Sequence, residues 1–287
     1  MKSGDRLLKV LWLFSAERPV QEVEEIARAL GISLSTAYRY VSQLCEAGFL
    51  APMGSVGYGL GPAIIELDRQ IRLADPLVQS AAPVLRRLQN DLDPTVTILL
   101  CRLYRDQVMC VAQRLGRDAQ PHLSYERGRP MPMLRGAPSK AILAHLPSRA
   151  AERLWEVDEE AGAAEADWKA FRAELSRIRK AGLVVSHSEI DPGVVGVAAC
   201  VFDPQGRPIG SICTVLPEPV AQPTIARVSA LTRASADEIT ATLFEREAAR
   251  QAAPPARAGR GGVSRGMAEA PAVPAVDAPA EPQKRVH

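Results

Sequence analysis

The chain has 287 residues, which is enough for two domains and a tail. Its formal net charge of +2 is too small to indicate a general polyanion binder, and no apolar stretch approaches the roughly 18 residues that a membrane span requires. The five cysteines form no CxxC pair and no disulfide-like ladder, so the simplest interpretation is a soluble cytoplasmic protein with reduced thiols.

Residues 1–19 superficially resemble a signal peptide. However, Lys9 interrupts the apolar run, and large apolar side chains recur around it at helical spacing. These side chains are Leu7, Val10, Leu11 and Phe14. We therefore predict that this segment is the first helix of an N-terminal domain rather than a leader.

Residues 24–50 predict two helices around one tight turn. The first helix has a buried stripe at the three- and four-residue spacing of one helix face, formed by Ile26, Ala27 and Leu30. Gly31 permits a sharp turn that a side chain would obstruct, and Ser33 can cap the start of the next helix.

The second helix of this pair has two different faces. Its inward face is formed by Ala37, Tyr40, Val41 and Leu44, and Gly48 fits the left-handed position after the last turn. The outward face carries hydroxyl, phenol, guanidinium and amide groups but no carboxylate, as suits a DNA groove. We expect the DNA contacts to come from Ser33, Ser35, Thr36, Tyr38, Arg39, Ser42 and Gln43. The alternative is an ordinary helical hairpin with a solvated polar face.

The charge balance of the first 60 residues counts against DNA binding, because six basic residues are matched by six acidic ones. Glu22, Glu24 and Glu25, however, lie at the start of the first hairpin helix, where they favourably meet its dipole. From there they can lie away from the outward face of the second helix.

A β-hairpin and two helices follow. Residues 49–60 predict two short strands around a Gly/Ser turn, which makes the motif a winged one. Residues 63–73 and a segment from Asp75-Pro76 to about Leu92 predict helices with apolar stripes. Such helices between two domains often carry dimer contacts, although core packing explains the stripes equally well.

The rest of the chain predicts an α+β domain on an antiparallel sheet. Strands are expected over residues 95–104, 107–114, 183–188, 194–202 and 208–216. Helices are expected over residues 139–146, 167–181 and 224–250, and a loop over residues 116–132. Residues 252–287 are rich in Ala and Pro and contain hardly any large apolar side chains, so they are expected to be disordered.

Taken together, these segments resemble the IclR-type bacterial transcriptional regulators. Residues 31–50 resemble the family's recognition helix, and residues 58–61 resemble the close of its wing. Residues 128–144 resemble the segment that leads into the family's Gly-Lys-Ala helix, and residues 189–203 resemble a second characteristic stretch. Four matches in the right order make the resemblance specific, and it covers roughly residues 4 to 247.

The resemblance implies a winged helix-turn-helix joined by helices to a GAF-like effector-binding domain, with an antiparallel sheet. It implies a DNA-binding domain over residues 1–62, linker helices and effector domain over residues 63–247, and a tail over residues 248–287. The implied partners are double-stranded operator DNA, a small organic acid effector, and further copies of the chain in a dimer or a dimer of dimers.

The wing departs from the family pattern. Gly59 stands where the family usually has a basic residue, and residues 52–61 carry no charge. Such a wing would contribute little phosphate binding.

The resemblance also implies an effector pocket. Its implied residues are Ala137, Pro138, Ser139, Ser186, Gly196, Cys213 and Val215, and we add Arg135 as a further candidate. Pro138 offers no amide donor and Val215 no hydroxyl, whereas Gly196 leaves room. We therefore expect a larger and less polar pocket for an aromatic or otherwise bulky organic acid, with Arg135 or Ser139 meeting the carboxylate. Alternatively, Cys213 and Val215 are simply strand core, and the chain senses a different ligand or none.

Two alternatives belong to other classes of function. The first is an enzyme. No Walker loop, GxGxxG or HExxH motif is present and the four histidines are scattered, so we expect no catalytic residue, cofactor or metal site. The second class is a ligand-binding or protein-interaction module whose hairpin has weak or lost DNA binding, which a neutral N-terminal domain permits.

Overall fold

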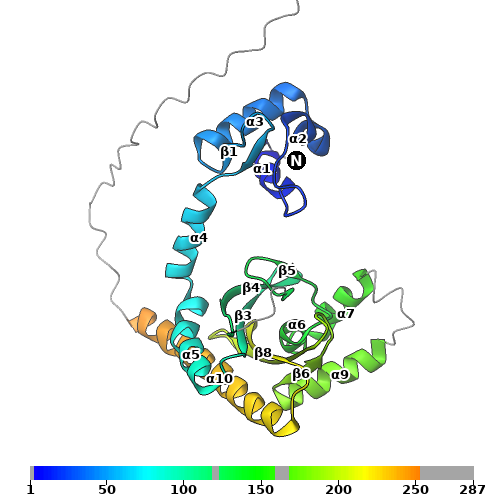
Figure 1. The fold of residues 1–287 in the computed structure, drawn as a ribbon, viewed down its shortest axis with the longest axis vertical. Coiled ribbons are helices and arrows are strands. Elements are labelled where there is room, and N and C mark those ends of the chain that lie inside the picture. The colour runs from blue at the N-terminus through cyan, green and yellow to red at the C-terminus, as the bar shows by residue number, and fades with distance from the viewer. Residues whose placement is uncertain (1–2, 118–122, 159–167, 253–287) are drawn as a thin grey trace, which may run out of the picture.

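The computed structural model describes residues 3–117, 123–158 and 168–252. A small N-terminal unit is joined through one helix to a larger α+β unit, which we call the body (Figure 1). The tail expected past residue 252, and Asp167 at the start of an expected helix, lie outside the described residues.

The N-terminal unit, which we call the head, contains three α-helices, one short 3-10 helix and a hairpin. Its elements are α1 (Ser3–Val10), the 3-10 helix η1 (Leu11–Leu13), α2 (Val23–Leu30), α3 (Leu34–Glu46), β1 (Leu50–Pro52) and β2 (Tyr58–Leu60). Their buried side chains form one cluster that joins α1, α2, α3 and β1. The expected inward face of α3 is confirmed, since Ala37, Tyr40, Val41 and Leu44 are all buried.

The turns of the head form as the sequence predicts. Gly31 and Gly48 both adopt left-handed backbone angles, with φ of 61° and 73°. Ser33 caps α3, because its side chain accepts a hydrogen bond from the Thr36 amide at 3.3 Å. The wing is an antiparallel pair in which Leu50 lies opposite Leu60. Gly61 has to be glycine, because a Cβ there would lie 2.3 Å from the Gly48 carbonyl oxygen.

The two linker helices differ in how much they bury. Helix α5 (Pro76–Asp91) packs a full apolar face against the body, whereas α4 (Ala63–Ala74) has no buried residue. Ile65 and Ile71 on α4 are 71% and 56% exposed, and Leu67 and Leu73 are also exposed. Of the apolar stripe that the sequence predicts on α4, Leu67 and Ile71 are exposed and Ile64 is half-buried, so most of it is uncovered in the single chain.

The body is built on a six-stranded antiparallel sheet in the order β5-β4-β3-β8-β7-β6. The strands are β3 (Thr97–Tyr104), β4 (Gln107–Arg114), β5 (Pro130–Met131), β6 (Val184–His187), β7 (Val194–Phe202) and β8 (Pro208–Pro217). The short strand β5 lies inside the segment that the sequence predicts as a loop. It pairs with β4 over only two residues, which is too short for periodicity to reveal.

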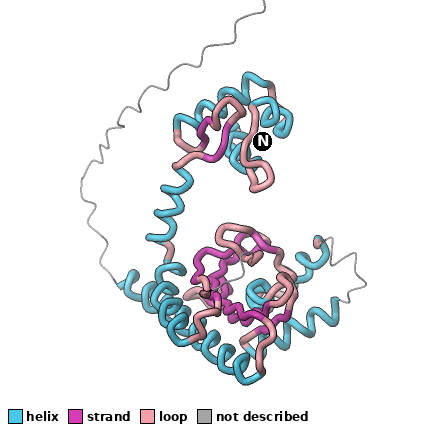
Figure 2. Tube along the Cα trace, viewed as in Figure 1, coloured by secondary structure: helices cyan, strands magenta, loops and turns pink. Residues whose placement is uncertain are grey.

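Helices cover both faces of this sheet (Figure 2). One face packs against α5 and α10 (Gln222–Ala252), and the other against α6 (Ala137–Leu143), α7 (Ser148–Val157) and α9 (Trp168–Ala181). Alternation along β3 serves both layers, since Ile98 and Leu100 face α5 while Leu99 and Cys101 face α6. Helix α7 was not predicted, and α10 extends past the boundary expected at residue 247.

Among the described residues, no helix combines the length and apolar character that crossing a membrane requires.

Candidate functional site

The outward face of α3 is a polar, carboxylate-free surface. Tyr38 is 51% exposed, and the side chains of Arg39, Ser42 and Gln43 are also exposed. The Arg39 guanidinium lies 5.6 Å from the centre of the buried Tyr40 ring, so a cation–π contact holds it beside the helix. A positive charge is thereby presented next to neutral hydrogen-bonding groups.

The hydroxyls at the start of α3 bond to one another. Ser33 Oγ lies 2.8 Å from Thr36 Oγ1 and 3.2 Å from Ser35 Oγ, in addition to capping the helix. Ser33 therefore has a structural role of its own, whereas Ser35 remains exposed. Of the seven expected DNA contacts, all but the half-buried Thr36 are exposed.

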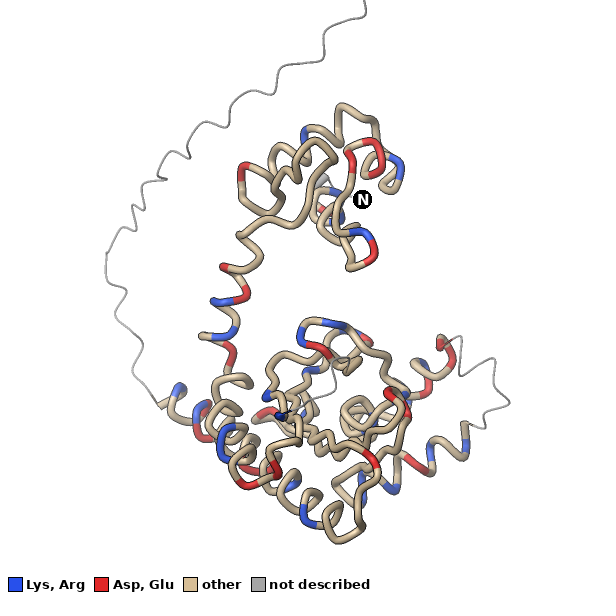
Figure 3. The backbone as a smooth tube through the Cα atoms, in the orientation of Figure 1, with Lys and Arg blue, Asp and Glu red and all other residues tan. Residues whose placement is uncertain are grey.

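The wing beside α3 carries no charged residue (Figure 3). It is held to the rest of the head by backbone hydrogen bonds, since Gln21 and Tyr58 exchange N–H···O bonds of 2.9 Å in each direction. A neutral wing of this kind can position α3 but supplies no charge to bind phosphates.

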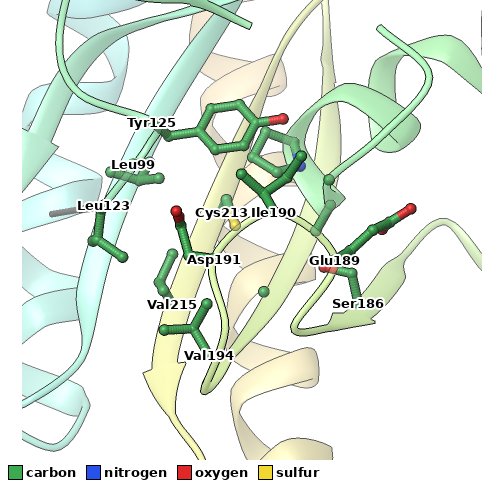
Figure 4. Close-up of a pocket in the computed structure, with 14 residues that line it drawn as sticks. Leu99, Leu123, Tyr125, Ser186, Glu189, Ile190, Asp191, Val194, Cys213 and Val215 are labelled. Atoms are coloured by element: carbon green, nitrogen blue, oxygen red, sulfur yellow. The ribbon is translucent and has the colours of Figure 1, made fainter. Parts of the chain in front are cut away.

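A second candidate site is a cavity of about 30 Å³ between α6 and the sheet (Figure 4). It contains six of the eight candidate residues named in the sequence analysis: Ala137, Pro138, Ser186, Gly196, Cys213 and Val215. The other lining residues were not anticipated, and they are Leu99, Leu123, Tyr125, Gly136, Glu189, Ile190, Asp191 and Val194. Most of them come from β3 and from the two loops over residues 123–136 and 188–193.

Arg135 and Ser139 do not line this cavity. Ser139 is fully buried, and its hydroxyl lies 2.8 Å from the phenol oxygen of Tyr125, which also donates to the Arg135 carbonyl at 3.1 Å. Tyr125 thus takes the place between α6 and the cavity that we expected for Ser139. Local sequence offers little signal for Tyr125, because its role depends on a loop folding back onto α6.

The expectation of a roomy pocket at Gly196 is corrected by the geometry. A Cβ at Gly196 would lie 3.1 Å from both the Ala137 Cβ and the Ser186 Oγ, so this glycine allows α6 to approach the sheet closely. The volume of about 30 Å³ holds only one or two water molecules. An aromatic ligand can enter only if the walls move apart.

The two loops over the cavity are fastened together. Asp191 accepts hydrogen bonds from the Ser124 hydroxyl at 2.6 Å and from the Ser124 amide at 3.0 Å. Opening the cavity on this side requires these bonds to break, which makes Ser124 and Asp191 a clasp between the loops.

The negative charge of Glu189 in the cavity wall is partly neutralised by the half-buried Lys140. Lys140 Nζ lies 2.5 Å from Glu189 and 3.0 Å from Glu174. Burial alone would lower the pKa of Lys140, but the two carboxylates outweigh it, so the net pKa shift is upward and the ammonium stays charged. Glu189 therefore faces the cavity as half of an ion pair.

The chemistry of the cavity suits binding rather than nucleophilic catalysis. Burial raises the pKa of the Cys213 thiol, so it stays protonated near neutral pH and is a weak nucleophile. The His187 ring is hydrogen-bonded to Glu218 at 2.9 Å.

Family comparisons agree with this two-site layout. The family model described as the IclR helix-turn-helix domain matches residues 3–52, and the one described as the bacterial transcriptional regulator IclR C-terminal domain matches residues 73–241. The second match alone covers more than half of the chain.

Curated relatives and solved structures point the same way. The chain is 31% identical over 178 residues to the HTH-type transcriptional regulator Rv1719 of Mycobacterium tuberculosis, covering 61% of this chain and 67% of that protein. It is 25% identical over 254 residues to the transcriptional repressor IclR of Escherichia coli, covering 84% and 89%. An IclR homolog of Microbacterium hydrocarbonoxydans, solved in complex with 4-hydroxybenzoate, has the same fold with a TM-score of 0.69 at 22% identity, covering 85% of this chain and all of that one.

Proposed function

Because the chain belongs to the IclR family of bacterial transcriptional regulators, we propose that it reads operator DNA with α3 and that a small organic acid in the α6 cavity changes its affinity for that DNA. The observation that carries this proposal is that one chain contains both a candidate DNA-binding face and a candidate ligand cavity. The head presents a polar α3 face without carboxylates, and the body encloses a cavity between α6 and the sheet.

The DNA-reading part rests on the outward side chains of α3. Tyr38, Arg39, Ser42 and Gln43 project from the exposed side of a helix whose opposite side fills the head core. In winged helix-turn-helix proteins such a helix enters the major groove. A head with six basic and six acidic residues in its first 60 has little general attraction for phosphates, so base contacts and two-head binding carry the affinity.

The effector part rests on the character of the cavity walls. Leu99, Ile190, Val194 and Val215 provide apolar surface, while Tyr125 and Ser186 provide neutral hydroxyls. These groups fit an aromatic acid better than a two- or three-carbon acid, and the Microbacterium homolog that shares this fold was solved with 4-hydroxybenzoate. Entry of such a ring requires the Ser124–Asp191 clasp to open.

A second copy of the chain completes the proposal. The exposed Leu67 and Ile71 and the half-buried Ile64 share one side of α4, and a second linker helix can cover this apolar face. A dimer built this way holds two heads at a fixed spacing and acts on the chromosome in the cytoplasm. We also propose that the DNA-binding domain ends at residue 62 and that the effector domain ends at residue 247. Helix α10 itself continues to Ala252.

Two experiments test the proposed function. Selection from a library of random DNA duplexes shows whether the full chain enriches a sequence; failure to enrich one would favour an interaction module that has lost DNA binding. Calorimetry with benzoate, 4-hydroxybenzoate and pyruvate identifies the acid class, and tighter binding of pyruvate would contradict the aromatic ligand.

A further inference from the structure

One segment of the body, residues 123–136, reaches the cavity, the linker helix and the head. We call it the coupling segment. Its Leu123 and Tyr125 line the cavity, and its Ser124 forms the clasp with Asp191. Only two residues after Tyr125, Arg127 contacts α4.

Arg127 forms an ion pair with Asp68 in the middle of α4. Its Nε also donates a hydrogen bond of 2.9 Å to the Val111 carbonyl on β4, so the guanidinium is fixed to the sheet at one side and to α4 at the other. Arg72 lies 3.1 Å from the second oxygen of Asp68. The hydrogen bond from Arg127 lowers the pKa of Asp68, so the carboxylate stays ionised at neutral pH.

This ion pair is important because α4 has little other attachment to the body. Helix α4 has no buried residue, so apolar packing does not fix its direction. A partly exposed ion pair is weak in isolation. It can nevertheless select one direction for a helix that is otherwise free to swing about its junction with α5.

The same segment also approaches the head. Arg129 lies close enough to Glu17 to contribute to the lowered pKa of that carboxyl, although the Ser15 hydroxyl makes the largest contribution. A second contact between body and head lies nearby, where the Arg105 guanidinium is 5.5 Å from the centre of the Trp12 ring. Cations of the body thus face the head from two loops.

We propose that Arg127 is the positioning residue that couples the cavity to the head, because it joins the segment that closes the cavity to the helix that carries the head. This inference rests on the proposed function and specifies how its regulation operates. A ligand that opens the Ser124–Asp191 clasp displaces Tyr125 and the neighbouring Arg127. The ion pair with Asp68 then shifts or breaks, α4 changes direction, and the distance between two heads on DNA changes.

The first test follows amide hydrogen exchange in the full chain. Arg127→Met and Asp68→Asn should each speed exchange in α4 by about fivefold or more, since opening of a helix end is set by its tertiary contacts. Arg69→Met is the matched control, because it removes one positive charge from an exposed site on α4. Arg127→Lys keeps a cation opposite Asp68, so exchange in α4 should be slower in this variant than in Arg127→Met. Unchanged exchange in both Arg127→Met and Asp68→Asn would overturn the inference.

The second test uses DNA and separates coupling from mere stability. In random-duplex selection, the wild-type chain should enrich paired half-sites at one spacing, whereas Arg127→Met should enrich the same half-site at scattered spacings. Arg127→Lys, which keeps the cation, should narrow the range of spacings again. A single unchanged spacing in Arg127→Met would overturn the inference and leave the proposed function standing. If the wild-type chain enriches no sequence, the proposed function fails, and hydrogen exchange still decides whether Arg127 fixes α4.

Discussion

Arg102 Nη2 lies 2.6 Å from Asp75 Oδ1, and this ion pair joins β3 to the junction between α4 and α5. The same carboxylate caps α5 by accepting a hydrogen bond of 2.9 Å from the Leu77 amide. Three residues earlier on β3, Leu99 lines the cavity. The point at which the linker turns is therefore fixed to a strand that also forms a wall of the candidate effector site.

Replacing Asp75 separates its two roles. Asp75→Asn keeps an oxygen for the helix cap but loses the charge pair, and we expect it to lower the free energy of unfolding by about 1–2 kcal/mol, because the carboxylate is only 9% exposed. Asp75→Ala loses the cap as well and should cost about 1 kcal/mol more. Urea denaturation followed by circular dichroism measures both. Equal stabilities for the two variants would show that the cap contributes nothing.

Arg39 is the cation we expect DNA binding to depend on most. Arg39→Ala should weaken binding to a selected duplex by about 10- to 100-fold, as expected for loss of a base or phosphate contact worth about 1–3 kcal/mol. Arg28→Ala makes the same change of charge at an exposed position on α2 and is the matched control. Fluorescence anisotropy gives both affinities. Equal losses in the two variants would mean that overall charge, not the α3 face, governs binding.

Gly196 offers a way to fill the cavity. Gly196→Val places two methyl groups towards the Ala137 Cβ and the Ser186 Oγ, which a Cβ alone already approaches to 3.1 Å. We expect calorimetric binding of 4-hydroxybenzoate to weaken at least tenfold, with overpacking costing about 1–3 kcal/mol of stability. DNA binding without ligand should persist. Ala173→Val on the exposed side of α9 is the control, and undiminished ligand binding in Gly196→Val would place the effector elsewhere.

His145 makes the stability of the body depend on pH. Burial, and then the charge of Arg179, lower the pKa of His145 from its ordinary value of 6.5. The imidazole ring packs edge-on against the Phe202 ring, with 4.9 Å between the two ring centres. Below pH 6.5 the unfolded chain therefore takes up the proton more readily than the folded chain. Stability is fully present above pH 6.5 and falls as the pH drops from there towards the lowered pKa.

Melting temperatures at pH 7.5, 6.5 and 5.5 measure this dependence. The wild-type chain should lose more stability across this range than His145→Gln, whose side chain does not titrate. Identical losses in the two proteins would assign the pH dependence to other groups.

The sequence predicts the head far better than the cavity, for physical reasons. The inward face of α3 follows from a periodicity of 3.6 residues, and the glycines at 31 and 48 mark turns that only a left-handed backbone completes. These are local properties. The apolar stripe on α4 shows the limit of prediction from periodicity, because periodicity identifies an apolar helix face but not the residues that cover it.

The cavity depends on contacts between distant residues. Ser124 and Asp191 are 67 positions apart, and Tyr125 reaches Ser139 only because the coupling segment folds back over α6. Family resemblance identified the wall formed by α6, β7 and β8, since those residues lie on regular elements. It gave no information on the loops, and it suggested extra space at Gly196 where the structure has a close approach.

Effector control of DNA binding is tested most directly by titrating a selected duplex with the full chain, with and without a saturating concentration of the aromatic acid that calorimetry shows to bind. A coupling free energy of about 1–3 kcal/mol would change the Kd for DNA by about 5- to 150-fold, and we expect a change in this range. An unchanged Kd with the acid bound would contradict the proposal that the α6 cavity regulates the head.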